Sequence, residues 1–221
     1  MITVHHLNDS RSQRVLWLLE EMGLPYEVKR YQRDAKTMLA PAALKAIHPL
    51  GKSPVLDEDD ARIAETGAII EYLLETHPGS SLRPAKGTEA ARRCTYWLHY
   101  AEGSAMTPLL LKLIFTAIPG RVPFLARGVA KGISKAMNAN MIDPQLTAHT
   151  AYWEAELTRS EWFAGDAFSA ADIMMSFPVE AAGSRVPYGP DKPKLKAFLQ
   201  KIHARPAYQR ALERGGPYSY A

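Results

Sequence analysis

The sequence predicts an α/β domain over residues 1–78, a linker over residues 79–88 and an all-α domain over residues 89–221. Three observations support this division. The first part alternates short strand-like runs with apolar stripes at helical spacing. The stretch THPGSSLRPAKGT, residues 76–88, is rich in Pro, Gly and Ser, which is typical of a linker. Beyond it the chain shows helical patterns and no further strand pattern.

Length and composition are those of a globular protein with a hydrophobic core. The chain has 221 residues, 47% of them hydrophobic, which allows one large domain or two small ones. The net charge of +4 comes from scattered lysines and arginines without a basic tract, so we expect no nucleic-acid partner. The single cysteine, Cys94, excludes an internal disulfide and is expected to be a buried apolar residue.

The N-terminus and the longer apolar runs bear on the compartment. The chain enters a strand pattern directly, without a basic and then apolar leader, so we expect a cytoplasmic protein. The apolar run Leu109–Ile118 is interrupted by Lys112 and preceded by Pro108, and it is shorter than a bilayer requires. We therefore expect no membrane partner.

The first two strands and the helix between them have clear local signals. Ile2–Leu7 is a short β-branched and apolar run, and Tyr26–Tyr31 alternates in the manner of a strand. Between them, apolar residues recur at helical spacing from Val15 to Met22, and Gly23 follows as the C′ residue. A crossover of this length predicts that the two strands are parallel.

Four further elements complete the first domain. Pro41–Ile47 predicts a short helix with proline in its first turn. Two short strands, Val55–Leu56 and Arg62–Ala64, follow, and an amphipathic helix begins at Thr66. The resulting order, βαβαββα, is that of a thioredoxin-like domain.

The second domain is predicted to consist of helices. They are expected over Glu89–Glu102, Leu109–Phe115, Phe124–Met141, a stretch from Asp143, Ile173–Ala182, Lys194–Ala204 and Pro206–Arg214. Pro108 should kink or restart a helix, and Asp143 with Pro144 should start a new one. Ser169 and Asp172 have the spacing of a capping box, with a hydrophobic residue before it.

The stretch between residues 49 and 76 combines three features that suit one ligand. Pro54 precedes a short strand, where a cis peptide bond would turn the backbone of Ser53 outward to pair with a peptide. The helix that opens at Thr66 offers backbone N–H groups to a carboxylate, and Glu65 beside them suits an amine. A ligand with an amine and a carboxylate at one end and a peptide bond further along fits all three. Glutathione is such a ligand.

The motifs GKSPVL, residues 51–56, and ETGAIIEYL, residues 65–73, resemble the glutathione-binding half of the cytosolic glutathione S-transferase family. The resemblance covers nearly the whole chain, and it is to serine-type members of the bacterial and fungal kind. It implies glutathione as co-substrate, no other cofactor, and attack of the glutathione thiolate on a small hydrophobic electrophile. It also implies a homodimer, with the helix that opens at Thr66 and the first helix of the second domain at the interface.

Two alternatives to a transferase stay open at this point. The same fold serves glutathione-dependent reductases, peroxidases and dehalogenases, and the fold by itself does not distinguish them. A non-catalytic module that binds glutathione or an apolar ligand is the second alternative. A conjugation assay with glutathione and a chloronitroaromatic substrate separates an enzyme from such a module.

The resemblance places the residue that activates glutathione just after the first strand. No Tyr or Cys lies between Leu7 and Arg14, so the candidates are Ser10, Ser12 and Asn8. Counting back from Arg14 favours Ser10; Ser12 is the second choice, and Asn8 could donate through its amide. The competing interpretation of Ser10 is a helix N-cap with no further role. A hydroxyl hydrogen bond and a helix N-terminus would both favour the thiolate.

Other residues are implied to bind glutathione by their position in the family pattern. They are Lys52, Ser53, Pro54, Glu65, Thr66, His48, Glu102 and Ser104. The cysteinyl unit is expected at Ser53, and the glycyl carboxylate at Lys52 and, more weakly, His48. Glu102 and Ser104 resemble positions from which some members reach the glutathione of a neighbouring subunit. A solvated helix face is the competing interpretation for these two.

Metal and disulfide chemistry have no support in the sequence. The seven histidines show no HExxH spacing, and the adjacent His5 and His6 should point to opposite faces of a strand. A single cysteine forms no Cys-x-x-Cys motif. We therefore expect no metal site.

Overall fold

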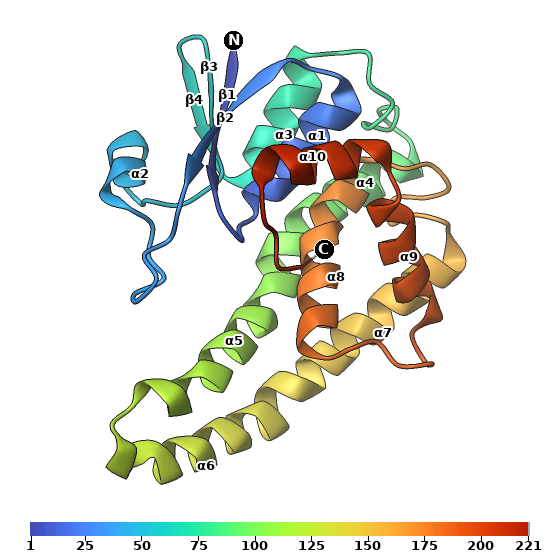
Figure 1. Cartoon of the computed structure of the whole chain (residues 1–221). Helices are drawn as coiled ribbons and strands as arrows, with labels where there is room; N and C mark the ends of the chain where they lie inside the picture. The colour runs from blue at the N-terminus through green and yellow to red at the C-terminus, as the bar shows by residue number, and fades with distance from the viewer. Residues whose placement is uncertain (221) are drawn as a thin grey trace.

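The computed structural model describes residues 1–220, in which a four-stranded sheet lies beside a larger set of helices (Figure 1). The first domain consists of β1 (Ile2–Leu7), α1 (Ser12–Met22), β2 (Tyr26–Tyr31), α2 (Ala42–Ile47), β3 (Val55–Glu58), β4 (Ala61–Ala64) and α3 (Thr66–Thr76). The strand order is β2-β1-β3-β4, with β1 parallel to β2 and the other pairs antiparallel. This confirms the thioredoxin-like order that the sequence predicts.

The two faces of the sheet are covered by different helices (Figure 1). Ile2 and Val4 of β1 are buried in the main core with α1 and α3, whereas Leu7 packs with Leu44 of α2 on the opposite face. This follows from the period of two along a strand. The first eight residues of α1, from Ser12, are all buried, because α1 is enclosed by β1, α3, α8 and α10.

The second domain consists of helices throughout the part that the structure describes. They are α4 (Glu89–Tyr100), α5 (Met106–Arg121), α6 (Arg127–Met137), α7 (Asp143–Arg159), α8 (Ala170–Arg185), α9 (Pro193–His203) and α10 (Pro206–Gly215). One π-helical turn, Ala101–Ala105, joins α4 to α5, and a second, Asn138–Ile142, joins α6 to α7. A short 3-10 turn, Phe124–Ala126, precedes α6. We propose residues 79–88, which lie between α3 and α4, as the linker.

Two predicted helix boundaries differ in detail from the structure. Pro108 occupies the third position of α5, but the chain before it is already helical, so Pro108 lies inside a continuous helical stretch and the irregularity is the π-helical turn that precedes it. α7 begins at Asp143, as predicted, but the chain before it is already helical. Asp143 is therefore not a cap; its carboxylate pairs with Lys112 of α5 at 2.6 Å.

The hairpin of α5 and α6 extends away from the rest of the molecule (Figure 1). The helical stretch Glu89–Arg121 has 33 residues and is long and apolar enough to cross a bilayer. In the apolar 18-residue segment of this helix, 28% of the residues are buried inside the protein. This differs from our expectation that the chain has no apolar stretch of that length. Core helices of soluble proteins pass the same test, so length and composition alone assign no membrane span.

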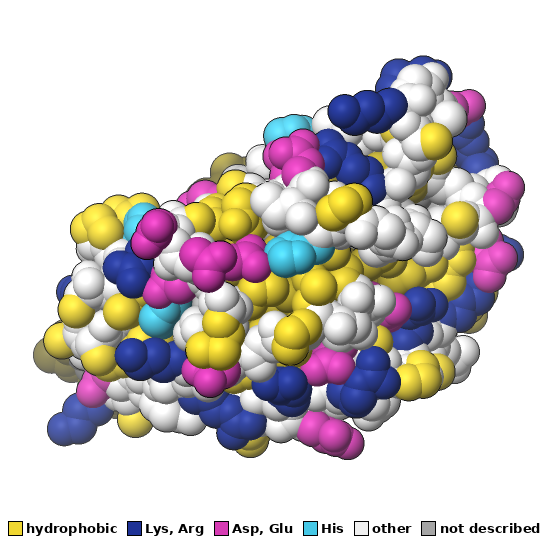
Figure 2. All heavy atoms as spheres, turned by 90° about the horizontal axis from the view of Figure 1, so that it is seen from above, with side chains coloured by type: hydrophobic (Ala, Val, Ile, Leu, Met, Phe, Trp, Pro, Cys, Tyr) yellow, Lys and Arg dark blue, Asp and Glu magenta, His cyan; other side chains and the backbone are white. Residues whose placement is uncertain are grey.

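Surface charges of both signs are interspersed, and large exposed apolar side chains gather on the α5–α6 hairpin. The face seen from above in Figure 2 intersperses basic, acidic and apolar side chains. The large exposed apolar residues include a group on the α5–α6 hairpin: Leu110, Leu113, Ile114, Phe124, Leu125, Val129 and Ile133. Exposed apolar surface of this extent is typical of a contact site.

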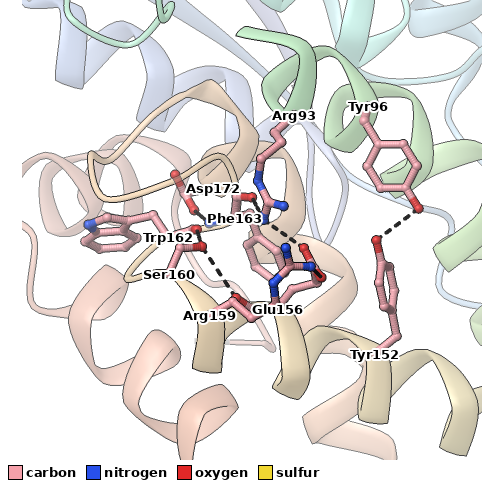
Figure 3. Close-up of polar contacts among 9 residues, drawn as sticks. All are labelled: Arg93, Tyr96, Tyr152, Glu156, Arg159, Ser160, Trp162, Phe163 and Asp172. Atoms are coloured by element: carbon pink, nitrogen blue, oxygen red, sulfur yellow. Dashed lines mark hydrogen bonds and ion pairs between the residues drawn. The ribbon is translucent and has the colours of Figure 1, made fainter. Parts of the chain in front are cut away.

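The predicted capping box at the start of α8 is present and buried. Figure 3 shows Asp172 beside Phe163 and Arg93. Asp172 Oδ2 accepts the backbone N–H of Ser169 at 2.9 Å, and its Oδ1 accepts the N–H of Phe163 at 2.8 Å. Arg93 donates to the Phe163 carbonyl at 2.9 Å and to Glu156 at 2.7 Å. Burial raises the pKa of Asp172 to about 7, against the opposing effect of these N–H donors. Together these contacts attach the start of α8 to α4 and α7.

We expect Asp172→Ala to lower the free energy of unfolding by about 2–6 kcal/mol. The change leaves the N–H groups of Ser169 and Phe163 buried without an acceptor, at about 1–3 kcal/mol each. Urea denaturation measures the effect. The exposed Asp166, in the same corner, is the matched control, and Asp166→Ala should change stability by less than about 0.5 kcal/mol. Equal stability of the two variants would contradict the structural role of Asp172.

Candidate active site

Three serine hydroxyls meet where β1 ends and α1 begins. Ser10 Oγ lies 2.7 Å from Ser12 Oγ and 3.4 Å from Ser53 Oγ. The Ser53 hydroxyl is held by β1, because it donates to the carbonyl of His5 at 2.8 Å and accepts the N–H of Leu7 at 3.1 Å. The pairing of β1 with β3 therefore brings Ser10 and Ser53 together from distant parts of the chain.

Behind the serines lies His6, which is buried on the α1 side of the sheet. Its Nδ1 is 2.8 Å from Ser12 Oγ. Burial, and next the charge of Arg30, lower the pKa of His6 to about 4, although the Gly215 carbonyl and Asp9 act in the opposite direction. The ring is therefore neutral near pH 7, so it carries one N–H.

Asn8 is directed away from the serines. Its Oδ1 accepts the backbone N–H of Arg33 at 2.9 Å, and its own backbone N–H donates to the carbonyl of Tyr31 at 3.2 Å. Both contacts are on the β2 side. Of the three candidates for activation, Ser10 lies nearest to Ser53, and the geometry therefore favours it over Asn8.

Glu65 and Thr66 open α3. Glu65 is exposed and has a φ of 74°, a conformation that residues other than glycine rarely adopt and that is common at functional sites. Its carbonyl accepts the N–H of Ile69 at 2.9 Å, so the N–H groups before Ile69 in the first turn are left without intrahelical partners. Thr66 is buried, and its Oγ1 accepts from Arg14 at 3.4 Å.

The remaining predicted residues lie on the periphery. Lys52 is exposed and comes just before the Ser53–Pro54 peptide bond, which is cis. His48 is half-buried at the end of α2, and Ser104 is exposed on the π-helical turn. Among the side-chain contacts of residues 1–220, none joins Lys52, His48 or Ser104 to the three serines.

Glu102 takes part in a contact within its own chain. Its carboxylate pairs with Arg14, and its other oxygen lies 2.9 Å from Nε of Arg11. The guanidinium carbons of Arg11 and Arg14 lie 5.7 and 5.4 Å from the ring centre of Phe177. Arg14, only 1% exposed, also donates to the carbonyl of Met174 at 2.8 Å. The start of α1 is thereby fastened to the π-helical turn and to α8.

Electrostatics keep the Glu102 carboxylate ionised. Burial raises its pKa, but the charges of Arg14 and Arg11 and their hydrogen bonds outweigh burial, and the net shift is downward. Two cations and one carboxylate leave a positive charge beside Ser10. Such a charge favours an anion at the N-terminus of α1.

Two other features of the described residues lie outside this cluster. A cavity of about 860 Å³ lies at the opposite end of α1, lined among others by Met22, Pro78 and Phe168, and it contains none of the predicted site residues. Residues 1–220 hold no group of three His, Cys, Asp or Glu side chains placed to share a metal ion.

Comparison with known proteins agrees with this geometry. Residues 10–76 match the family model described as "Glutathione S-transferase, N-terminal domain", and residues 135–206 match "Glutathione S-transferase, C-terminal domain". "Glutathione S-transferase 1" of Saccharomyces cerevisiae is 34% identical over 97% of this chain and 95% of its own length. The chain belongs to the glutathione S-transferase family.

The matches to two further relatives also cover nearly the full length of this glutathione S-transferase family member. "Glutathione S-transferase 3" of Schizosaccharomyces pombe is 32% identical over 97% of this chain and 88% of its own length. A crystal structure of a glutathione S-transferase from Actinobacillus pleuropneumoniae superposes with a TM-score of 0.81, at 34% identity, and covers 97% of this chain and 93% of that one. The predicted family and its two-part fold are confirmed.

The sequence analysis did not place His6 and Arg11 at the candidate site of this glutathione S-transferase. The alternation of β1 correctly placed His5 and His6 on opposite faces: His5 contacts Tyr31 at 2.8 Å, and His6 contacts Ser12. Which face meets the serines depends on how α1 packs, and one strand does not reveal it. Arg11 could have been noticed as a cation beside Ser10, but its partner Glu102 lies in another domain.

Proposed function

We propose that the protein catalyses attack of the glutathione thiolate on a hydrophobic electrophile, with Ser10 donating a hydrogen bond to the sulfur. The observation that carries the proposal is the position of the Ser10 hydroxyl at the N-terminus of α1, facing Ser53 across 3.4 Å. That contact is long for a hydrogen bond between hydroxyls, so Ser53 holds the proton of Ser10 only weakly.

The chemistry required of Ser10 is modest. The thiolate is the nucleophile, and an unperturbed thiol has a pKa of about 8.5. Lowering that pKa by about two units requires about 2.7 kcal/mol of differential stabilisation. One hydrogen bond to a charged group contributes about 1.5–3 kcal/mol, and the positive end of α1 with Arg11 nearby adds to it. Placing the electrophile beside the sulfur accounts for much of the remaining acceleration.

In this proposal, glutathione is held by residues at the start of α3 and by the segment just before β3. The γ-glutamyl carboxylate binds the free N–H groups at the start of α3, and its amine pairs with Glu65. The backbone of Ser53 pairs with the cysteinyl unit. The exposed Lys52, the residue before Ser53, binds the glycyl carboxylate. Thr66 supports this end through its contact with Arg14.

The electrophile is proposed to bind against aromatic residues of the second domain. Phe177 of α8 lies under the guanidinium of Arg11, the residue next to Ser10, and its ring meets Tyr220 edge to face at 5.3 Å. The C-terminal segment returns to the site, because the N–H of Ser219 donates to Asp9 at 2.8 Å. Phe177 is only 6% exposed, so the aromatic surface offered to an apolar co-substrate is that of the half-buried Tyr220.

The first prediction concerns Ser10. The wild-type protein should conjugate glutathione to a chloronitroaromatic substrate, and Ser10→Ala should raise the pKa of the bound thiol by about one to two units, the equivalent of one charged hydrogen bond. The rate near neutral pH should then fall about tenfold to a hundredfold, with recovery at high pH. Glutathione affinity should change little, since the other contacts remain. The measurement is the pH dependence of the conjugation rate.

Ser12→Ala is the control and should shift the profile less, because Ser12 lies behind Ser10. An unchanged profile for Ser10→Ala would remove the assignment. Activity with peroxides, disulfides or alkyl halides in place of conjugation would favour the reductase, peroxidase and dehalogenase alternatives. Binding of glutathione without turnover of any of these would identify a non-catalytic module.

The second prediction concerns Glu65. Glu65→Ala should weaken glutathione binding by about 1.5–3 kcal/mol, the contribution of a hydrogen bond between charged groups. Calorimetric titration measures it. Glu71, further along α3, is the matched control, and Glu71→Ala should bind glutathione as the wild type does. Equal affinities for both variants would show that the amine binds elsewhere.

We also propose that the protein is a homodimer. The family resemblance implied α3 and the first helix of the second domain as the interface, and in the structure Ile69, Ile70, Leu73 and Leu74 of α3 are buried in their own chain. Exposed apolar surface is instead available on the α5–α6 hairpin, where Phe124 and Leu125 are 78% and 94% exposed. Interfaces of homodimers are more apolar than the rest of the surface, so the proposal shifts to this hairpin.

The dimer is tested by sedimentation. The mass should be twice that of one 24.5 kDa chain at micromolar concentration, and Leu113→Glu with Ile114→Glu on the hairpin should reduce it to one chain. Val186→Glu is the control, because Val186 is similarly exposed but lies at the end of α8. A single-chain mass for the wild type would rule the dimer out, and an unaltered dimer in the hairpin variant would place the interface elsewhere.

A further inference from the structure

A buried carboxylate of α8, that of Glu180, lies outside the cluster described above. The residue is 2% exposed. Its Oε1 accepts the hydroxyl of Tyr208 at 2.6 Å and the Nε2–H of His203 at 3.1 Å. Its Oε2 accepts the hydroxyl of Tyr218 at 2.7 Å. Burial of a carboxylate without such donors is costly, so Glu180 and the groups that donate to it hold one another in place.

The groups that donate to Glu180 come from two parts of the chain. His203 and Tyr208 belong to α9 and α10, and their rings lie 4.9 Å apart. Tyr218 belongs to the C-terminal segment, residues 217–220, which leaves the end of α10 and descends to α8 (Figure 1). Burial, and next the charge of Glu180, raise the pKa of Tyr208 and of Tyr218, so both hydroxyls keep the proton that they donate.

The C-terminal segment borders the candidate active site. The N–H of Ser219 donates to Oδ1 of Asp9 at 2.8 Å, and Asp9 is the residue before Ser10. The half-buried ring of Tyr220 meets that of Phe177 edge to face at 5.3 Å. Tyr220 is thus placed to contact an apolar group attached to a sulfur that lies beside Ser10.

Within residues 1–220, two hydrogen bonds hold the C-terminal segment, and they differ in strength. The segment forms no helix or strand, and Gly216, with a φ of 87°, ends α10 in a conformation that favours glycine. The bond from Ser219 to Asp9 is exposed, whereas the bond from Tyr218 to Glu180 is shielded from solvent. Water competes with an exposed bond more than with a shielded one, so the contact with Glu180 is the stronger of the two.

We propose that Glu180 is a positioning residue for the electrophile: by accepting the hydroxyl of Tyr218, it keeps the C-terminal segment docked beside the N-terminus of α1, with Tyr220 as one wall of the apolar site. This inference rests on the proposed binding of an apolar group beside the glutathione sulfur. Glu180 touches neither substrate. When the segment leaves its place, the apolar group loses one wall, while the contacts of glutathione with the starts of α3 and β3 remain.

The test compares Tyr218→Phe with Tyr208→Phe. Each change removes one hydroxyl and one hydrogen bond to Glu180 and keeps the ring, but only Tyr218 belongs to the C-terminal segment. The probes are glutathione and S-hexylglutathione, which carries an apolar chain on its sulfur, and calorimetric titration measures both affinities. Tyr218→Phe should weaken S-hexylglutathione binding about threefold to tenfold, because the segment is docked in a smaller fraction of molecules. Its glutathione affinity should stay unchanged, and Tyr208→Phe should bind both probes as the wild type does.

Two further measurements follow the segment and the reaction. The Ser219 amide is protected by Asp9 only while the segment is docked, so its hydrogen exchange, followed by NMR, should be faster in Tyr218→Phe than in the wild type or in Tyr208→Phe. In the conjugation assay, Tyr218→Phe should raise the KM for a chloronitroaromatic substrate about threefold to tenfold and leave the KM for glutathione and the pH profile unchanged. Tyr220→Ala should reproduce this rise, and the double variant should add little, since both changes act through one segment.

Three results would overturn the inference. Unchanged exchange of the Ser219 amide in Tyr218→Phe would show that Glu180 does not hold the segment. Faster exchange with an unchanged affinity for S-hexylglutathione would show that the segment is no part of the electrophile site. Equal losses of that affinity in Tyr218→Phe and Tyr208→Phe would show that Glu180 has a general structural role.

These results are distinct from those that test the proposed function. Binding of S-hexylglutathione and exchange of the Ser219 amide need no turnover, so a non-catalytic module would still show the effect of Tyr218→Phe. If Ser10→Ala keeps the wild-type pH profile, the role of Ser10 is wrong, and the role of Glu180 is decided by the binding and exchange measurements. A wild type that binds S-hexylglutathione no more tightly than glutathione would overturn this inference whatever its conjugation rate.

Discussion

The arrangement of this molecule depends on the burial of one charge, the guanidinium of Arg14. A buried cation without partners is costly, so its neighbours must stay in place. They come from three elements besides α1: Thr66 at the start of α3, Glu102 in the π-helical turn and the Met174 carbonyl of α8. One side chain therefore holds the N-terminus of α1 against both domains, and the site is built around that N-terminus.

The same contacts set the electrostatics of the site. Arg11, one turn from Arg14, shares the Glu102 carboxylate, and the remaining positive charge lies beside Ser10. The N-terminus of α1 adds the partial positive charge of the helix dipole. The cluster of Arg11, Arg14 and Glu102 thus holds the two domains together and also favours an anion beside Ser10. A change at Glu102 would alter both, since it would leave the buried Arg14 without its counter-charge.

The π-helical turn explains how Glu102 reaches this cluster. A regular continuation of α4 through residue 105 would place successive side chains at 100° intervals, whereas the wider turn Ala101–Ala105 shifts them. π-turns of this kind are frequent at functional sites. The second one, Asn138–Ile142, lies in the facing helix, where α6 passes into α7.

The sequence by itself determined what depends on near neighbours along the chain. The strand and helix order, the Gly23 helix end and the capping box of Asp172 all follow from local backbone chemistry. Ser10 and Ser12 became candidates only through the family resemblance, by their place after β1. Local preferences act over a few residues, so a short window of sequence contains the information for them.

Only the tertiary structure decided which distant groups meet. Glu102 and Arg14 are separated by 88 positions, and the sequence around either residue does not predict that it contacts the other. His6 was indistinguishable from His5 until the packing of α1 brought Ser12 against one face of β1 and left the other to Tyr31. The exposed apolar hairpin had the same composition as a core helix. Pairings of this kind depend on how whole elements pack, and no residue pattern within one element specifies them.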